Sequence, residues 1–406
     1  MTSTHPGGNP RRRPGRRWLL AFALGAVVLV ATAGAVVAGR GGGGGTPDRE
    51  AAGPAATPDA GTTTGTPDDP ADGAPRRRAV RGVQGHLLWE AVDGAERRRR
   101  LDAIRDAGAE LVRVDVGWSD LEAEGRGRWD ADGLAAIDAL LTEAAARDLE
   151  VLLTLWQTPC WASSAPENRK QSCQGAWWER DVQRYPPRDA AEYGRAARFL
   201  AGRYAGRVAA WELWNEPNAE DSLGGPGKAA AYTAMVKAAY RPIKRVDPNT
   251  KVLAGALALA DVEFTRQLID EGIGDQLDGF SVHPYAGSRP ATDRQRRDDS
   301  FAYAVPAVHR ALVNAGIDAP VWLTEIGWSS CDRGTAEGDQ CVDEDTQAER
   351  LRGAYRLLDR WDWVESAVWY RLRDGDTGER IDNYGLQNPD GSPKPAFDAF
   401  KAAAER

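Results

Sequence analysis

The sequence of 406 residues predicts a (β/α)8 barrel, an α/β fold, and three observations favour it. Eight short β-rich runs occur between residues 79 and 406, longer segments of helical period fall between them, and two of the runs end on a glutamate. Such alternation is typical of βα units and a parallel sheet. Eight units of this kind close into a barrel. The alternative is an open, doubly wound sheet, but no glycine-rich phosphate loop follows the first strand.

The expected strands and helices follow one another without an internal sequence repeat. The strands are expected at about 81–86, 110–116, 149–156, 208–214, 251–257, 278–282, 320–325 and 365–371. The helices are the Ala-, Arg- and Leu-rich segments between them, for example 95–107, 131–147, 188–204, 228–246, 262–271, 301–315 and 345–361.

Composition divides the chain into residues 1–40, 41–78 and 79–406. The middle part contains almost no large apolar side chain and is rich in Gly, Thr, Pro, Ala and Asp. It cannot bury enough surface to offset its ordering entropy, so we expect a disordered linker. The last part has an ordinary globular composition and is long enough for one large core, which predicts a single folded domain over 79–406.

Residues 1–40 predict a membrane anchor or a signal peptide. Five arginines at positions 11–17 precede an uncharged run from Trp18 to Ala38. This run reaches the length needed to span a bilayer, and the arginines favour a cytoplasmic N-terminus. The small residues at 31–33 also allow a cleaved signal peptide. We favour the uncleaved, single-pass anchor, and both alternatives place the globular part outside the cytoplasm.

The four cysteines form two local pairs, Cys160 with Cys173 and Cys331 with Cys341. An even number in an exported chain favours disulfides, although spacing alone does not establish the connectivity. A metal site is the alternative, but no C-x-x-C motif or nearby histidine pair supports it. Each pair would close a loop that follows a predicted strand.

The charge of the chain argues against a nucleic-acid partner. The net charge is −8, the sequence pI is near 5.3, and no basic stripe occurs in the globular part. A protein that binds nucleic acid usually carries such a stripe.

Two glutamates end predicted strands, Glu216 in the run WELWNEPN at 211–218 and Glu325 in VWLTEIGW at 321–328. Barrel enzymes carry their catalytic groups at the C-terminal ends of the strands. Two carboxyl groups are sufficient to cleave a glycosidic bond, because one donates a proton and the other attacks or activates water. A Ser-His-Asp esterase is not expected, since the sequence contains no G-x-S-x-G motif.

Over residues 81–400 the chain resembles clan A of the glycoside hydrolases, and within it families five and thirty-nine. The most specific matches are WNEP at 214–217 and LTEIGW at 323–328. The resemblance implies a retaining (β/α)8 enzyme in which Glu216 is the general acid/base and Glu325 is the nucleophile. It also implies that Asn215 binds the sugar 2-hydroxyl, with a loop-capping amide as the alternative.

The strand around Arg113 has a two-residue period. Val112, Val114 and Val116 can face the helices, so that Arg113 and Asp115 point into the barrel. The resemblance implies that Arg113 lies beside the nucleophile. The alternative is an arginine that faces a helix or pairs at the bottom of the barrel.

Further site residues follow from the same resemblance. Tyr285 would orient Glu325, and His283 would contact the substrate or the carboxylates, although a lone histidine is more often structural. His86, after the first strand, is a weaker candidate. Trp369 matches the tryptophan under the reacting sugar. Trp156 is expected to line a subsite, where its ring would stack on a sugar ring. Core packing is the alternative for both.

Glu212 and Asp115 are expected to be structural charge partners of Arg113, because neither lies at the C-terminal end of a strand. The expected protein is a retaining glycoside hydrolase that cleaves β-linked O-glycosidic bonds in an extracellular polysaccharide or glycoconjugate. We expect a monomeric catalytic domain that is tethered to the membrane, with no cofactor and no metal. The alternatives are an envelope transglycosylase and a non-catalytic carbohydrate-binding barrel.

Overall fold

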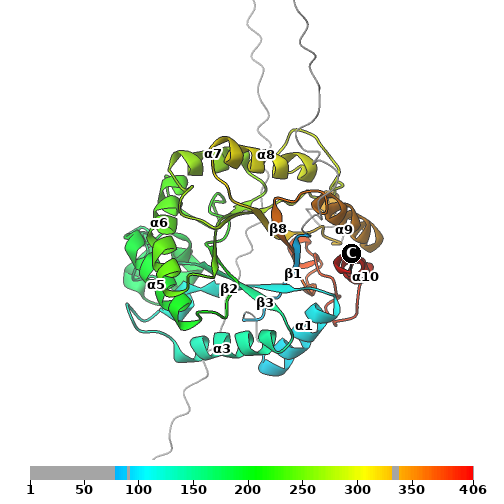
Figure 1. Cartoon of the computed structure of the whole chain (residues 1–406). Coiled ribbons are helices and arrows are strands. Elements are labelled where there is room, and N and C mark those ends of the chain that lie inside the picture. The colour runs from blue at the N-terminus through cyan, green and yellow to red at the C-terminus, as the bar shows by residue number, and fades with distance from the viewer. Residues whose placement is uncertain (1–77, 89–91, 332–337, 406) are drawn as a thin grey trace, which may run out of the picture. The chain divides into compact units, whose positions relative to one another are not determined.

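The computed structural model describes residues 78–88, 92–331 and 338–405. Within these ranges eight parallel strands close into a barrel in sequence order, with β8 paired to β1, and a ring of helices surrounds them (Figure 1). The predicted (β/α)8 barrel is confirmed.

The strands agree closely with the expected ones. They are β1 (Val80–Gln84), β2 (Leu111–Gly117), β3 (Glu150–Trp156), β4 (Ala210–Leu213), β5 (Lys251–Ala258), β6 (Gly279–His283), β7 (Val321–Ile326) and β8 (Val364–Trp369). The last strand ends two residues earlier than expected, and this difference affects the site described below.

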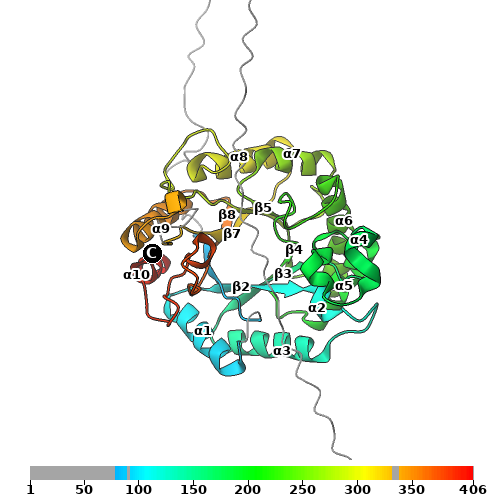
Figure 2. The same cartoon turned by 180° about the vertical axis from the view of Figure 1, so that it is seen from behind.

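The helices include two short ones that the sequence did not predict. The long helices are α1 (Gly94–Asp106), α3 (Ala131–Ala145), α5 (Ala190–Arg203), α6 (Lys228–Val246), α7 (Val262–Asp270), α8 (Phe301–Asn314), α9 (Glu344–Leu358) and α10 (Pro395–Ala404). The short ones, α2 (Trp118–Leu121) and α4 (Glu167–Lys170), follow β2 and β3 and are visible in Figure 2. Four residues are too few for a helical period to appear in a sequence.

Aspartates begin five of the described helices. The carboxylates of Asp93, Asp130, Asp189, Asp261 and Asp343 each accept a hydrogen bond from a backbone amide of the first turn. Such a cap stabilises a helix by about 1 kcal/mol. The caps therefore define where each of these helices begins after a strand-to-helix loop.

The interior of the barrel changes from apolar to charged along the strands. A small apolar cluster includes Leu111, Ala210 and Trp322, near the N-terminal ends of their strands. Two residues further along β2 and β4, the inward positions are Arg113 and Glu212. Val112, Val114 and Val116 belong to the larger core between sheet and helices, as predicted. The two-residue period of a strand produces this division.

Both predicted disulfides are present. Cys160 is bonded to Cys173 in the loop after β3, and Cys331 is bonded to Cys341 after β7. The first loop has a small core of its own that includes Trp177 and Val182. Since both loops follow the C-terminal ends of strands, the disulfides constrain the face of the barrel that carries the two glutamates.

The predicted N-terminal anchor and nearly all of the predicted linker lie outside the described residues. In the part of the chain that the structure does describe, no helix is both long enough and apolar enough to cross a membrane.

Candidate active site

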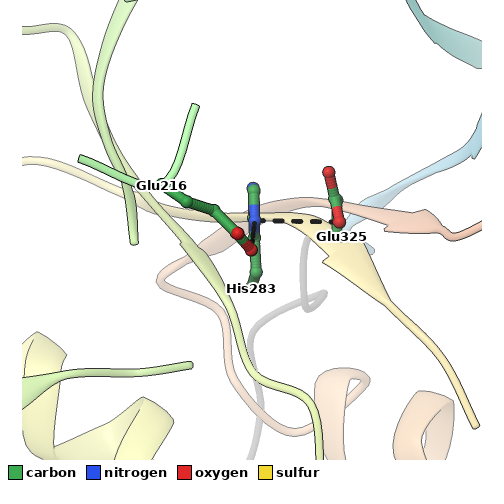
Figure 3. A group of neighbouring side chains, drawn as sticks. All are labelled: Glu216, His283 and Glu325. Atoms are coloured by element: carbon green, nitrogen blue, oxygen red, sulfur yellow. Dashed lines mark hydrogen bonds and ion pairs between the residues drawn. The ribbon is translucent and has the colours of Figure 1, made fainter. Parts of the chain in front are cut away.

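Glu216 and Glu325 lie on opposite sides of one buried histidine, His283 (Figure 3). His283 Nδ1 is 3.0 Å from Glu216 Oε1 and 3.7 Å from Glu325 Oε2. One carboxylate oxygen of each glutamate and one nitrogen of His283 all lie within 4.8 Å of one another. The two glutamates that the sequence singled out, from β7 and from the loop after β4, therefore form a close carboxyl pair.

Glu325 is fixed through both of its oxygens. Arg113 Nη1 lies 2.6 Å from Oε1, and the Tyr285 hydroxyl donates a hydrogen bond of 2.7 Å to Oε2. A cation and a hydroxyl donor on one carboxylate restrict its orientation. The side chain is only 10% exposed. Glu325 is therefore positioned as an oriented carboxylate at the bottom of the site.

Arg113 connects several groups of the site. It is fully buried and donates hydrogen bonds to Glu212 (2.9 Å), to Gln84 (3.1 Å), to Asn215 (2.8 Å) and to Glu325. Burial alone would lower the pKa of Arg113, but the charges of Glu212, Asp115 and Glu325 outweigh it and raise the pKa. Arg113 therefore remains a cation inside the barrel, beside the predicted nucleophile.

Glu212 is a buried partner of Arg113, as its position on β4 predicted. It also accepts a hydrogen bond of 2.8 Å from Thr154. Burial would raise the pKa of Glu212, but Arg113 and then His283 lower it overall. With no exposed surface, Glu212 cannot reach a substrate, and it balances the charge of Arg113 from below.

The backbone around Glu216 has an unusual conformation. Trp214 and Glu216 have positive φ angles, 71° and 47°, in the left-handed region that side chains other than glycine rarely adopt. Such residues cost roughly 1–3 kcal/mol each and persist where neighbouring contacts hold them. Here the two backbone amides donate to Leu155 (2.9 Å) and Ala256 (2.8 Å) on the adjacent strands. This turn directs the Glu216 carboxyl back over the barrel.

His283 is placed to carry a positive charge between the two glutamates. Burial alone would lower its pKa, but the Glu325 charge and the hydrogen bond and charge of Glu216 outweigh burial and raise the pKa. Nδ1 faces both carboxylates, so it is the nitrogen that bears the proton in this arrangement. The imidazolium would reduce the repulsion between the two glutamates.

Asn215 and His86 lie at the edge of this cluster. Asn215 is half-buried, its side-chain oxygen accepts from Arg113, and its amide nitrogen makes no hydrogen bond to another described residue. His86 packs edge-on against Tyr370, with ring centroids 5.4 Å apart. Burial, followed by the charges of Arg371 and Arg113, holds the pKa of His86 well below its ordinary value, so this histidine is neutral.

The expectation that Trp369 lies under the reacting sugar is wrong. Trp369 has no exposed surface, its indole nitrogen donates to the Tyr384 carbonyl (2.9 Å), and its ring stacks on Trp328. A ring without exposed surface cannot stack on a sugar. The next residue, Tyr370, is partly exposed and packs edge-on against Tyr285 at 6.2 Å. Tyr370 therefore offers the aromatic surface that was expected of its neighbour.

Trp156 remains a candidate with a small accessible surface. It is the last residue of β3, it lies beside Gly117 in the register with β2, and it is 8% exposed. An edge of the indole therefore reaches the C-terminal face of the barrel, while most of the ring belongs to the core.

The three atoms within 4.8 Å of one another would also suit a metal ion, but their contacts argue for another use. His283 Nδ1 already faces Glu216 at hydrogen-bonding distance, and both oxygens of Glu325 are occupied by Arg113 and Tyr285. A metal ion would have to compete with the buried cation of Arg113. The arrangement instead fits a hydrogen-bonded carboxyl pair that performs acid/base and nucleophilic chemistry.

Two contributors to the site were not identified from the sequence. Gln84, at the end of β1, accepts from Arg113 (3.1 Å) and donates to Asp115 (2.5 Å), so it links two side chains of β2. Tyr384 packs against Tyr285, with ring centroids 5.3 Å apart. A polar side chain at the last position of β1 was the only sequence signal for Gln84, and Tyr384 gave none.

Known proteins resemble this chain in sequence and in fold. The family model "Cellulase (glycosyl hydrolase family 5)" matches residues 71–359. A protein of Oryza sativa subsp. japonica named "Putative mannan endo-1,4-beta-mannosidase 9" is 25% identical over 277 residues, which are 61% of this chain and 66% of that protein.

Two solved structures share the fold. A family 39 glycoside hydrolase from Bacteroides cellulosilyticus WH2 has a TM-score of 0.62 and 22% identity, covering 80% of this chain and 64% of that one. GH5_18 from Streptomyces cattleya, solved in complex with GlcNAc, has a TM-score of 0.62 and 19% identity, covering 82% and 81%. The chain thus spans slightly less than two thirds of the rice and Bacteroides proteins. Because the family model matches well over half of its residues, the chain belongs to glycosyl hydrolase family 5, a family of glycosidases.

Proposed function

We propose that this protein is a retaining glycoside hydrolase that cleaves β-linked bonds of an extracellular polysaccharide or glycoconjugate. The observation that supports retention is the spacing of the two carboxyl groups, whose nearest donor oxygens lie within 4.8 Å. Retaining enzymes have carboxyl groups about 5–5.5 Å apart, whereas inverting enzymes leave about 6.5–9.5 Å for a water molecule. This spacing favours the retaining arrangement over the inverting one.

In the first step Glu325 attacks the anomeric carbon and forms a glycosyl ester. The glycosidic C–O bond breaks, and the leaving oxygen takes the proton of Glu216. Arg113 and Tyr285 hold the Glu325 carboxylate in the orientation that attack requires. Glu216 is the more exposed of the pair, at 20% against 10%, as suits a group that must reach the leaving oxygen and later water.

In the second step Glu216 takes a proton from a water molecule, and the resulting hydroxide attacks the anomeric carbon and releases Glu325. Glu216 becomes charged between the two steps, and the adjacent His283 imidazolium would stabilise that charge. The amide nitrogen of Asn215, which no described residue uses, is available to donate to the sugar 2-hydroxyl, a contact that strengthens in such transition states. Tyr370 takes the stacking role that Trp369 cannot fill.

The substrate panel should begin with β-mannosides. The rice relative carries a mannan endo-1,4-beta-mannosidase name, and other structural neighbours are GH5_18 in complex with Manb1-4GlcNAc and an exo-beta-1,4-mannosidase from an Opitutaceae bacterium. At such low identities these names suggest where to start and do not identify the sugar. A panel of aryl β-glycosides and β-linked polysaccharides, assayed with the full chain, would identify it.

An extracellular location is part of the proposal. Two disulfides near the active face suit an oxidising compartment, and the uncharged run Trp18–Ala38 suits a membrane anchor. An anchored barrel would act on polymers close to the cell surface. The intact mass of the native protein tests this, since a chain that starts near residue 34 or beyond would show cleavage and release.

Transglycosylation is the second candidate, because the same residues can transfer the glycosyl group to a sugar hydroxyl. The ratio of free reducing sugar to longer products, measured at rising acceptor concentration, separates the two. Glu216→Gln and Glu325→Gln are assayed beside the wild type. Activity that is lost in both variants supports the proposal, and activity that persists in either contradicts the assigned roles.

A further inference from the structure

Three carboxyl groups around Arg113 and His283 have exposed surface. The side chains of Glu216, Glu325 and Asp115 are 20%, 10% and 6% exposed. The side chains of Arg113, Glu212 and His283 are not exposed at all. Since only an exposed group can touch a sugar, Asp115 is the one carboxyl of the site that is accessible and has no part in the two-step mechanism.

The hydrogen bonding of Asp115 is incomplete. Its Oδ2 accepts a hydrogen bond of 2.5 Å from the Gln84 amide. Its Oδ1 lies 3.7 Å from Arg113 Nη1, which is too long for a hydrogen bond, and it accepts none from the other described residues. The Asp115 side chain nevertheless keeps 6% of its surface exposed. Asp115 therefore presents an unused acceptor to the site.

Glu212 shows how a purely structural carboxyl in this barrel is arranged. Its side chain has no exposed surface, Arg113 and Thr154 both bind its Oε2 at 2.8 Å, and its Oε1 is enclosed by protein without a hydrogen-bond partner among the described residues. Asp115 has the weakest of the three ion pairs with Arg113, since Glu212 lies at 2.8 Å and Glu325 at 2.6 Å. Glu212 thus encloses its unpaired oxygen, whereas the Asp115 side chain keeps 6% of its surface exposed, which a merely structural role does not explain.

Asp115 lies close enough to Glu325 to contact the same sugar. Asp115 Oδ1 and Glu325 Oε1 are both neighbours of one atom, Arg113 Nη1, at 3.7 Å and 2.6 Å. A pyranose whose anomeric carbon contacts Glu325 carries further hydroxyl groups elsewhere on its ring, beyond the 2-hydroxyl assigned to Asn215. One of these hydroxyls can donate to Asp115 while the ring stays against Glu325.

We propose that Asp115 is a substrate-binding residue that accepts a hydrogen bond from a hydroxyl of the reacting sugar, and that it selects uncharged sugars over uronic acids. This inference depends on the proposed function and adds a substrate class to it. Four carboxyl groups, Asp115, Glu212, Glu216 and Glu325, lie around Arg113 and His283. A uronate would bring a further negative charge against Asp115, whereas a neutral hydroxyl fills the open acceptor.

The titration of Asp115 is consistent with this use. Burial raises its pKa to about 6, with Glu325 and Glu212 adding to the effect and Arg113 and the Gln84 hydrogen bond opposing it. Tyr370, directly after β8, also lies in its electrostatic range. Hydrogen bonds from a sugar hydroxyl stabilise the charged form of the carboxyl, so binding would partly relieve the cost of burying it.

The test uses Asp115→Asn in the full chain. Asparagine keeps the shape and can still accept from Gln84, but it removes the charge. We expect kcat/KM for a neutral aryl β-hexoside to fall about 10- to 100-fold, as for the loss of a hydrogen bond to a charged group. For one deoxy analogue of that hexoside, the kcat/KM of the wild type should fall by the same factor. The kcat/KM of the variant should be no lower on this analogue than on the hexoside itself. Asp132→Asn, an exposed aspartate on α3, is the matched control and should match the wild type.

Two further measurements test the role of Asp115, one in the wild type and one by binding without turnover. The kcat/KM of the wild-type enzyme should be at least about 10-fold higher for the hexoside than for the corresponding uronide. This comparison needs no variant. Calorimetric binding of the neutral sugar to Glu216→Gln, with and without Asp115→Asn, reports on Asp115 independently of turnover. The role of Asp115 would be overturned if the wild type cleaved the uronide as fast as the hexoside. It would also be overturned if, for every deoxy analogue, the loss in kcat/KM from the missing hydroxyl simply added to the loss from Asp115→Asn. Sugar binding that depends on Asp115 without any wild-type turnover would instead refute the proposed hydrolysis.

Discussion

Arg113 and Glu325 are 212 residues apart in sequence, yet Arg113 Nη1 and Glu325 Oε1 lie 2.6 Å apart inside the barrel. They come from β2 and β7, which are not neighbours in the sheet. The long arginine side chain therefore crosses the interior and joins the predicted nucleophile to Glu212 and Asn215. This ion pair links the stability of the barrel interior to the orientation of the reacting carboxylate.

Glu325→Gln should reduce turnover at least about 1000-fold, because the amide cannot form the glycosyl ester. The fold should be kept, since glutamine has the same shape, its one oxygen can accept from Arg113, and its NH2 group can donate to the Tyr285 hydroxyl oxygen. Steady-state kinetics and the thermal midpoint measure the two effects. Glu263→Gln, an exposed residue of α7, is the control. Wild-type-like turnover in Glu325→Gln would contradict the assignment of the nucleophile.

Arg113→Gln should lower the free energy of unfolding by about 3–5 kcal/mol, because it leaves Glu212 buried without its cation. Arg203 forms an ion pair with Asp138 at the surface, where both side chains are exposed. Arg203→Gln should therefore change stability by less than about 1 kcal/mol. Urea unfolding at neutral pH gives both values. Similar small losses in the two variants would show that the buried network does not stabilise the fold.

Tyr285→Phe removes the hydroxyl that donates to Glu325 Oε2 and leaves the ring in place. We expect kcat to fall about 10- to 100-fold, as for one hydrogen bond to a charged group, with little change in stability. Tyr240→Phe, which removes a hydroxyl bonded to Asp278 far from the pair, is the matched control. An unchanged kcat in Tyr285→Phe would mean that Arg113 alone is enough to orient the nucleophile.

The pKa of Asp115 predicts how stability depends on pH. Its folded-state value of about 6 lies above the ordinary 3.8, so the stability it contributes is complete below about pH 3.8 and is lost as pH rises through about 6. The stability of the wild type relative to Asp115→Asn should therefore fall by about 2–3 kcal/mol between pH 4 and 8. Unfolding curves at both pH values measure this. A difference that stays constant with pH would place Asp115 in an unperturbed environment.

The sequence predicted the scaffold and the main cluster for clear physical reasons. The period of two in β2 correctly separated the outward valines from Arg113 and Asp115, and the motifs around Glu216 and Glu325 located the carboxyl pair. Trp369 failed because two aromatic residues are adjacent at the end of β8, and the sequence does not show which of them faces the site. Gln84 was missed because its role lies in contacts between strands, which leave no pattern along the chain.

The stereochemistry of hydrolysis tests the close carboxyl pair most directly. Proton NMR can follow the anomer that first appears when the full-length enzyme cleaves an aryl β-glycoside found in the panel. We expect the β-anomer to form first and then to mutarotate, because two displacements at the anomeric carbon retain its configuration. Initial release of the α-anomer would show a single displacement by water and would contradict the assignment of Glu325 as a nucleophile.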